Sequence, residues 1–214
     1  MTFEEKVELF FFDHVRDRDD YIDEYKRLNP GRVSREGGKY RYSPLFLIRK
    51  DIDYCFAFGR ELNPCRNNIH PAEFAGFVLI NTCFTSLLKK YYYGNFLTFA
   101  RDWMGIANQS ELDALRYLRN GLMHNFYGLY FYDNNRGVKV YFSLGPYPNI
   151  IRKSGSRTSP YPSETYEVNH RQLFIEFNRA IGSLKNKLLD PTETKLRSNF
   201  NSNFDLDTWM VTGP

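Results

Sequence analysis

The sequence predicts an all-α fold, in which four or five helices form a bundle and a β-hairpin is inserted before the last long helix. Long segments between residues 3 and 190 carry apolar residues at the spacing of three and four that is typical of amphipathic helices. At about residues 129–144 this spacing changes to the alternation of apolar and polar residues that is typical of paired strands. Four amphipathic helices are enough to enclose a hydrophobic core.

Start and stop signals bound each predicted helix. We expect helices at residues 3–28, 44–62 and 71–93, a short helical piece at 96–105, and longer helices at 110–126 and 170–190. Pro44 suits the first turn of the second helix, and Gly94 ends the third. Ser110 is expected to cap the fifth helix, and Asn169 together with Gln172 resembles the start of a capped last helix.

The β-hairpin occupies about residues 129–144. Its second strand alternates four apolar residues with three others, namely Val138, Val140, Phe142 and Leu144 with Lys139, Tyr141 and Ser143. The turn DNNRG precedes this strand and joins it to the first one. A third strand at 164–168 is expected to join the hairpin, whereas residues 145–163 are rich in Pro, Gly and Ser and are predicted to form a loop.

These elements predict one helical domain over residues 1–190, with the β element inserted at 128–168. Residues 191–214 are predicted to form a polar C-terminal tail that contacts the domain only through Phe200, Phe204 and Trp209. A chain of 214 residues with 42% hydrophobic residues can bury one good core, and two full domains would be cramped.

Composition argues against several classes of protein. The net charge of +4 favours an anionic partner only mildly. The three cysteines include no C-x-x-C pair, so we expect no disulfide framework, no metal site and a reducing, cytoplasmic location. The longest apolar stretch, residues 74–88, is too short and too polar to cross a bilayer, so no membrane partner is expected. Glycine-rich phosphate loops are absent from the sequence, and we predict no cofactor.

The most informative segment is RNGLMH, residues 119–124, on the predicted helix 110–126. Because a helix advances about 100° per residue, five apolar residues fall on one face that is expected to enter the core: Leu112, Leu115, Leu118, Leu122 and Phe126. Asn120 and His124 are one turn apart on a second face. Arg119 and His124 are about 140° apart and could both reach a group that lies across this second face.

An Arg, a polar residue, three further residues and a His on a late helix resemble the signature of HEPN domains. These are small helical bundles found in prokaryotic toxins, antiphage systems and RNA-processing proteins. The resemblance covers residues 119–124 as matched positions and about 44–190 as a fold. It implies a metal-independent endoribonuclease in which Arg119, Asn120 and His124 are catalytic. It also implies a composite site, formed where the helices 110–126 of two protomers meet in a homodimer, with RNA as the substrate.

The residue types fit this chemistry. His124 could take the proton from the 2′-hydroxyl of RNA, because the ordinary pKa of a histidine is about 6.5. Arg119 could hold phosphate oxygens, and Asn120 could bond either the phosphate or His124. A two-fold interface presents two histidines, one for each proton transfer.

One position departs from the family pattern. The toxins that a partner nucleotidyltransferase controls carry a Tyr two residues after the His, and Phe126 stands at this position here. Modification of such a Tyr is therefore not expected. An antitoxin or another protein partner is still an expectation, because toxins and defence proteins of the family act in such a setting.

Further candidates for RNA binding are six cations and one tyrosine: Lys89, Lys90, Tyr92, Arg116, Arg152, Lys153 and Arg157. In the segment KKYYYGNF, tyrosine rings could stack on bases, or they could cover the edge of the core while the lysines face the helix dipole. The basic residues of the loop 145–163 either bind phosphate or are simply solvated.

Two other interpretations of the motif remain open. Arg119 could form an ion pair with a neighbouring helix, and His124 could be an exposed residue that the C-terminal end of the helix dipole favours. Alternatively, the chain is a catalytically inactive HEPN-like module that binds RNA or a protein. His170 is expected at the surface or at a helix cap.

Overall fold

The fold is given by a computed structural model of the chain. The described residues are 1–12, 18–62, 71–92, 94–125, 130–133, 136–143, 148–157 and 163–212. At some helix and strand ends, residues 121–125 among them, only the backbone is described.

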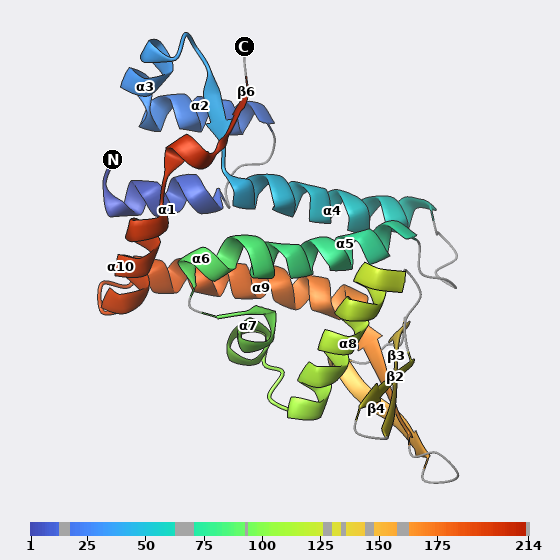
Figure 1. Ribbon diagram of the computed structural model, residues 1–214. Coiled ribbons are helices and arrows are strands. Elements are labelled where there is room, and N and C mark those ends of the chain that lie inside the picture. Colours follow the sequence, from blue (N-terminus) through green and yellow to red (C-terminus); the bar gives the residue numbers. More distant parts are fainter. Residues whose placement is uncertain are drawn as a thin grey trace.

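The middle of the molecule consists of long helices that run side by side (Figure 1). These are α4 (Pro44–Leu62), α5 (Pro71–Thr82) and α9 (His170–Leu189), and the short α1 (Phe3–Phe11) packs on both α4 and α9. The helix α5 continues through a π-helical segment (Cys83–Leu88) into α6 (Lys89–Tyr91). The predicted bounds of the helices 44–62 and 170–190 are confirmed to within one residue, and the chain is predominantly helical as expected.

Smaller elements lie on either side of this helical layer. On one side are α2 (Arg18–Leu28), α3 (Pro30–Arg35) and a two-stranded sheet of β1 (Tyr40–Tyr42) and β6 (Met210–Thr212). On the other side lie α7 (Phe96–Trp103), α8 (Gln109–Asn125) and a four-stranded sheet (Figure 1). None of the helices in the described ranges combines the length and the apolar character that a membrane span needs.

The predicted helix 3–28 is wrong, because two helices occupy this segment. The helix α1 ends at Phe11, and Phe12 adopts a left-handed conformation with φ 47°. A left-handed conformation costs roughly 1–2 kcal/mol in a residue other than glycine. Burial of the Phe12 ring, whose centroid is 4.1 Å from that of Tyr21 on α2, offsets this cost. The helical period alone carries no sign of this break.

The core is aromatic to an unusual degree. Phe84 of the π-helical segment contacts Phe99 of α7 at 3.8 Å and Phe177 of α9 at 5.3 Å between ring centroids. Phe10 of α1 packs edge-on against Phe200 near the C-terminus. Such pairs add to the burial of apolar area and join helices that are distant in the sequence.

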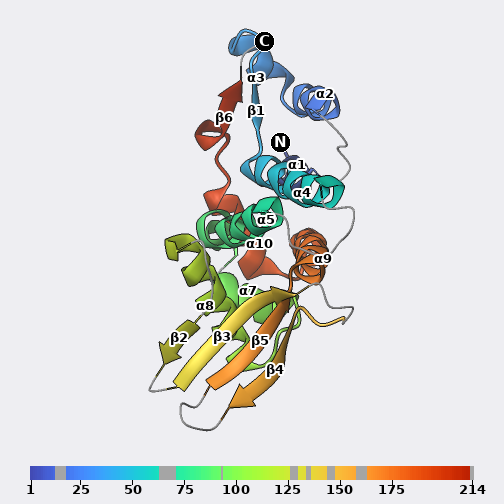
Figure 2. The same cartoon turned by 90° about the vertical axis from the view of Figure 1, so that its right-hand side faces the viewer.

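The sheet is larger than the predicted hairpin, and the description of the fold as all-α is therefore too narrow. Its strands are β2 (Tyr130–Asp133), β3 (Arg136–Ser143), β4 (Ile151–Arg157) and β5 (Ser163–Asn169), in the order β2-β3-β5-β4 (Figure 2). The hairpin β2–β3 and the third strand β5 are confirmed, with β5 parallel to β3. The predicted loop 145–163 is wrong at β4, which forms an edge strand antiparallel to β5.

The four-stranded sheet packs one face against α8. Val138 and Val140 of β3 are buried on this face together with Tyr166 and Val168 of β5, while Lys139 is exposed on the other face. The strand β5 leads directly into α9, where the Asn169 side chain accepts a hydrogen bond from the backbone N–H of Gln172 at 3.1 Å. The predicted cap is therefore confirmed, and it ties the sheet to the helical layer.

The C-terminal segment has more structure than the predicted polar tail. It forms α10 (Thr194–Asn203), a 3-10 turn (Leu206–Thr208) and β6. Phe200 and Trp209 are buried as predicted, and Phe204 packs against both rings. In addition, β6 pairs with β1, about 170 positions away in the sequence.

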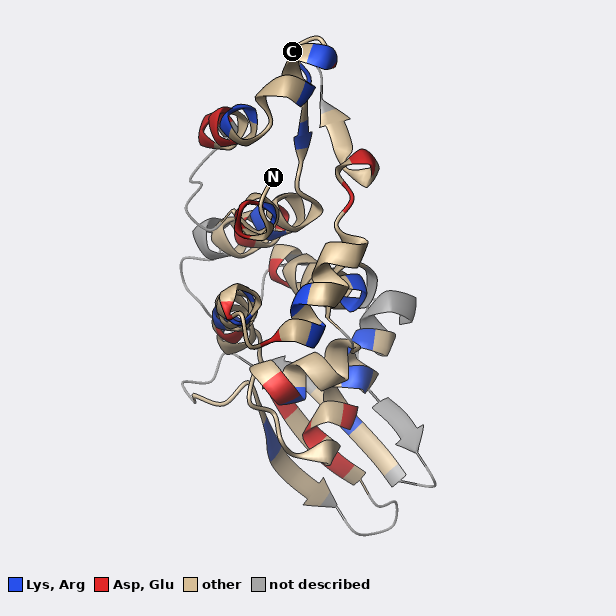
Figure 3. Ribbon diagram, turned by 90° about the vertical axis from the view of Figure 1, so that its left-hand side faces the viewer, with Lys and Arg blue, Asp and Glu red and all other residues tan. Residues whose placement is uncertain are grey.

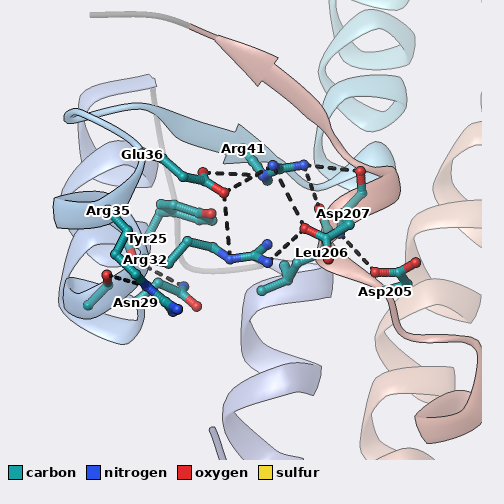
Figure 4. A network of polar contacts seen from close by, with 10 residues as sticks. Tyr25, Asn29, Arg32, Arg35, Glu36, Arg41, Asp205, Leu206 and Asp207 are labelled. Carbon is teal, nitrogen blue, oxygen red and sulfur yellow. Dashed lines mark hydrogen bonds and ion pairs between the residues drawn. The ribbon is translucent and has the colours of Figure 1, made fainter.

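A network of charged groups holds this C-terminal segment to the N-terminal part of the chain (Figure 4). The Arg41 guanidinium donates to Glu36 at 3.0 Å and to the carbonyl oxygens of Leu206 and Asp207 at 3.2 and 3.0 Å. Arg32 donates to the Asp207 carboxylate at 2.7 Å. We call Arg32, Glu36, Arg41 and Asp207 the terminal clasp.

Candidate functional site on helix α8

The helix that carries the RNGLMH segment begins at a local cap. The backbone N–H of Ser110 donates to the Asn108 side chain at 2.9 Å, and the N–H of Leu112 donates to the Asn108 carbonyl at 3.0 Å. Asn108 therefore caps α8, in place of the predicted Ser110. Gly105, with φ +73°, lies in the turn from α7 to α8, where a residue with a side chain would be strained.

One face of α8 is buried. Leu112, Leu115 and Leu118 lie on this face together with Ala114, and the helix packs on α5 and on strands β3, β4 and β5. The predicted core face is thus confirmed as far as Leu118. The side chain of Leu122 and the whole of Phe126 lie outside the described residues.

The opposite side of α8 is less buried. Asp113 and Arg116 have side chains that are 31% and 47% exposed, and Tyr117 and Asn120 are partly exposed. By helical geometry these four positions and that of His124 fall within an arc of about 100°. We call Asp113, Arg116, Tyr117 and Asn120, with the position of His124, the open stripe.

Arg119 lies at the border between the buried face and the open stripe. Helical geometry places it about 100° from Asn120 and beside the leucines. Its guanidinium nevertheless donates from Nη1 to the Asn120 side-chain oxygen at 3.1 Å. This hydrogen bond brings a permanent positive charge to the edge of the open stripe.

The partners of Arg119 and Arg116 differ. Among the described side chains, no carboxylate pairs with Arg119, whose one hydrogen bond goes to a neutral amide. Arg116 pairs with Asp113 at 3.2 Å, and its guanidinium lies 5.2 Å from the centroid of the Tyr117 ring. Within the described part of the chain, the charge of Arg119 is therefore uncompensated, which suits an anionic ligand.

His124 lies in the last turn of α8, four positions after Asn120. Its backbone continues the helix, so the predicted i, i+4 relation to Asn120 is confirmed. Its side chain lies outside the described residues, and the predicted approach of its ring to a substrate remains a prediction.

The cations of strand β4 are engaged within the sheet. Arg152 donates to Glu167 on β5 from Nε at 3.0 Å and from Nη2 at 2.8 Å, and Lys153 pairs with the buried Glu164. Both cations therefore face carboxylates across the pair of strands β4 and β5. The sequence had suggested instead that they lie in a loop and are solvated or bind phosphate. Arg157 ends β4, and its side chain is outside the described part of the chain.

The segment KKYYYGNF divides between surface and core. Lys89 and Lys90 are exposed on α6, whereas Tyr92 is partly buried and donates from its hydroxyl to Asp102 at 2.8 Å. The Tyr92 ring packs edge-on against Trp103 at 5.7 Å between centroids. The helix α6 and the strand β4 lie in different parts of the molecule (Figure 1), so the predicted RNA-binding residues do not form one surface.

Sequence reasoning missed a buried contact between a histidine and a carboxylate. His170, expected at the surface or at a cap, is 1% exposed, and its Nε2 lies 3.1 Å from a carboxylate oxygen of Glu73, which is equally buried. Arg171 approaches the same oxygen at 3.6 Å. No signal in the sequence joins these residues, because the contact depends on the packing of α5 against α9. It locks the start of α9 in place and is closed to a substrate.

Comparison with known proteins yields no matching family model, no matching curated protein and no matching solved structure.

Proposed function

We propose that the protein is a metal-independent endoribonuclease of HEPN type, and that Arg119, Asn120 and His124 act at a site formed by two copies of α8. The observation that carries this proposal is the hydrogen bond from Arg119 to Asn120. This bond holds the Arg119 guanidinium at the edge of the least buried side of the helix. Among the described side chains, this guanidinium has no carboxylate partner. His124 follows on the same side one turn later.

The open stripe supports the requirement for a second copy. A single α8 provides one histidine position, whereas cleavage needs a base for the 2′-hydroxyl and an acid for the leaving oxygen. A two-fold contact between open stripes would place two copies of His124 and Arg119 around one groove. The partly exposed Tyr117 and the stem of Arg116 would supply apolar area to such a contact.

The proposed reaction is an internal transesterification. One imidazole takes the proton of the 2′-hydroxyl, and the 2′-oxygen attacks the adjacent phosphorus. The bond from phosphorus to the 5′-oxygen breaks, and the second imidazole, in its protonated form, gives that oxygen a proton. Arg119 stabilises the charge that builds on the phosphate oxygens. The products are a 2′,3′-cyclic phosphate and a 5′-hydroxyl, and no metal ion takes part.

The biological setting that fits this proposal is that of a toxin or an antiphage defence protein. The resemblance of residues 119–124 is the basis for this part of the proposal. An antitoxin or another inhibitory protein would then be expected to cover the open stripe, because that surface is needed by both the second copy and the RNA.

Cleavage of single-stranded and structured RNA in the presence of EDTA tests the proposal. Wild type should yield 2′,3′-cyclic phosphate ends, and Arg119→Ala and His124→Ala should each lose most of this activity. Arg27→Ala is a matched control, because Arg27 is 66% exposed and pairs with Glu24 on α2, a helix on the other side of the helical layer from α8 (Figure 1). Light scattering on the same samples gives the oligomeric state.

Two results would contradict the proposal. If both α8 variants cleave as well as wild type, the activity resides elsewhere or in a contaminant. If the protein is a strict monomer at high concentration and still cleaves, the scheme with two histidines is wrong. Binding of RNA without cleavage, in wild type and variants alike, would identify the chain as an inactive binding module.

A further inference from the structure

A hollow of about 590 Å³ lies where the end of α7, the last turns of α9 and the start of α10 meet. Its lining includes Tyr92, Trp103, Leu196, Lys187 and Lys195. We call it the α7–α10 hollow. Its volume lies within the range of sites for small ligands, which is roughly 300–1,000 Å³. Along the helices of the molecule, Lys and Arg positions are interspersed with Asp and Glu positions (Figure 3).

The aromatic wall of the hollow is held rigidly. Trp103 stacks on Phe99 with an interplanar angle of 22°, and Tyr92 meets the indole edge-on at 82°. The Tyr92 hydroxyl is fixed by its hydrogen bond to Asp102. Side chains that are already held by such contacts lose little conformational entropy when a ligand stacks on them.

The outer face of the indole is covered by a charged group. The Lys187 ammonium lies 5.3 Å from the centroid of the Trp103 ring and 3.3 Å from the Glu193 carboxylate. The Lys187 side chain is 55% exposed and that of Glu193 is 36% exposed. Ion pairs this exposed contribute little, so a planar ligand that stacks on the indole can displace Lys187 at small cost.

The charges around the hollow favour an anion. The Asp102 carboxylate is already neutralised by Arg101 at 2.7 Å, which lowers its pKa, and it also accepts the Tyr92 hydroxyl. Two lysines of the lining, Lys187 and Lys195, then stand against one further carboxylate, that of Glu193. Lys195 is exposed at the rim, and Ser183 adds a hydroxyl. An apolar ring surface beside two lysines and a hydroxyl suits a ligand that joins a planar ring to a phosphate.

We propose that the α7–α10 hollow binds a nucleotide unit, with the base stacked on Trp103 and the phosphate held by Lys187 and Lys195. In this state Lys187 exchanges its contact with Glu193 for one with the phosphate. The source of the unit is either a free nucleotide or a residue of single-stranded RNA, and both present the same chemistry. The inference does not depend on the function proposed for α8.

The indole N–H signals of Trp103 and Trp209 in NMR spectra provide the test. AMP should shift the Trp103 signal saturably and leave that of Trp209 unmoved, because Trp209 is 2% exposed and does not belong to the lining of the hollow. Trp103→Phe identifies the signal. Adenosine and inorganic phosphate should each bind more weakly than AMP. A 2′-O-methyl oligonucleotide, which cannot be cleaved through its 2′-oxygen, reports on the RNA source.

Three variants test the roles of the charges. Lys187→Ala and Lys195→Ala should each weaken AMP binding about tenfold, since each loses a charge-assisted hydrogen bond. Glu193→Gln should tighten it a few-fold, because the carboxylate no longer competes for Lys187. A merely structural role for Glu193 would not produce tighter binding. Lys139→Ala, an exposed lysine on the outward face of the sheet, is the matched control and should change nothing.

The proposal is overturned if neither AMP nor the oligonucleotide moves the Trp103 signal at millimolar concentration. It is also overturned if the lysine variants and Glu193→Gln bind like wild type, or if adenosine binds as tightly as AMP. Binding of the oligonucleotide alone supports the nucleotide unit and assigns its source to RNA. Repeating the titration on Arg119→Ala separates this site from α8, since the result should be unchanged.

Discussion

The terminal clasp and the open stripe of α8 both place arginines beside polar side chains. The two regions differ in the hydrogen-bond partners that they give to these arginines. In the terminal clasp, Arg41 is 13% exposed and bonds a carboxylate and two carbonyl oxygens, while Arg32 pairs with Asp207. On α8, Arg119 has a single neutral partner, Asn120, among the described residues. An arginine that bonds carboxylates and carbonyl groups of the chain stabilises the fold, whereas one with most of its donors to spare can bind an anion from outside.

The largest effect is expected when the charge on α8 is removed. Arg119→Ala should lower the rate of RNA cleavage about 10²–10³-fold, because a positioned cation at the developing phosphate charge is lost. Its free energy of unfolding should change by less than about 1 kcal/mol, since a single hydrogen bond to a neutral amide disappears. Cleavage assays and urea denaturation of the same preparation measure both. A large loss of stability would show that Arg119 mainly stabilises the fold.

The reverse pattern is expected in the terminal clasp. Arg41→Ala should lower the free energy of unfolding by about 2 kcal/mol, because Glu36 and two carbonyl groups lose a charged donor. Cleavage by the folded fraction should equal that of wild type. Urea denaturation gives the first quantity, and activity per folded molecule gives the second. Unchanged stability would show that the C-terminal strand does not depend on this network.

Asn120→Asp converts the partner of Arg119 into a carboxylate, as in the terminal clasp. We expect stability to stay the same or to rise slightly, and cleavage to fall about tenfold, because the carboxylate competes with phosphate for the guanidinium. Asn120→Ala controls for the loss of the amide. If Asn120→Asp cleaves like wild type, the neutral partner of Arg119 has no importance for the reaction.

The smallest effect concerns pH. The hydrogen bond from Arg41 holds the pKa of Glu36 below its ordinary value of 4.5. Ionised Glu36 therefore stabilises the fold above this value, and the contribution is lost as the pH falls through the lowered pKa. The difference in Tm between wild type and Glu36→Gln should be clear at pH 6 and should shrink below about pH 4. A difference that stays constant with pH would exclude this carboxylate as its source.

The elements that sequence analysis predicted well are those with local causes. The helices α4 and α9 were predicted because each has its own apolar face and its own start signal, Pro44 or Asn169. The hairpin β2–β3 was predicted from its turn and its alternation. Three features of the candidate site follow from the helical period alone. They are the helix itself, its buried leucines and the spacing of one turn between Asn120 and His124.

The failures involve contacts between distant segments. The strand β4 has polar residues and a glycine, and it is a strand only because β5 supplies its hydrogen bonds. The left-handed Phe12 depends on burial against Tyr21. Arg152 and Lys153 are candidates for RNA binding in the sequence, but in the structure they face Glu167 and Glu164. These carboxylates lie on β5, and the sequence gives no sign that β5 pairs with this segment.

The sequence by itself determined the predominantly helical character, the amphipathic faces and the position of an Arg-Asn pair one turn before a histidine, because these depend on the backbone period and on nearby residues. Only the tertiary structure decided which arginines are neutralised. Arg41 meets a segment that lies more than 160 positions later, whereas Arg119, among the residues that the structure describes, meets only its neighbour. Whether a charge is compensated depends on which chain segments fold against it, and that is the physical reason why a stabilising arginine and a candidate binding arginine look alike in the sequence.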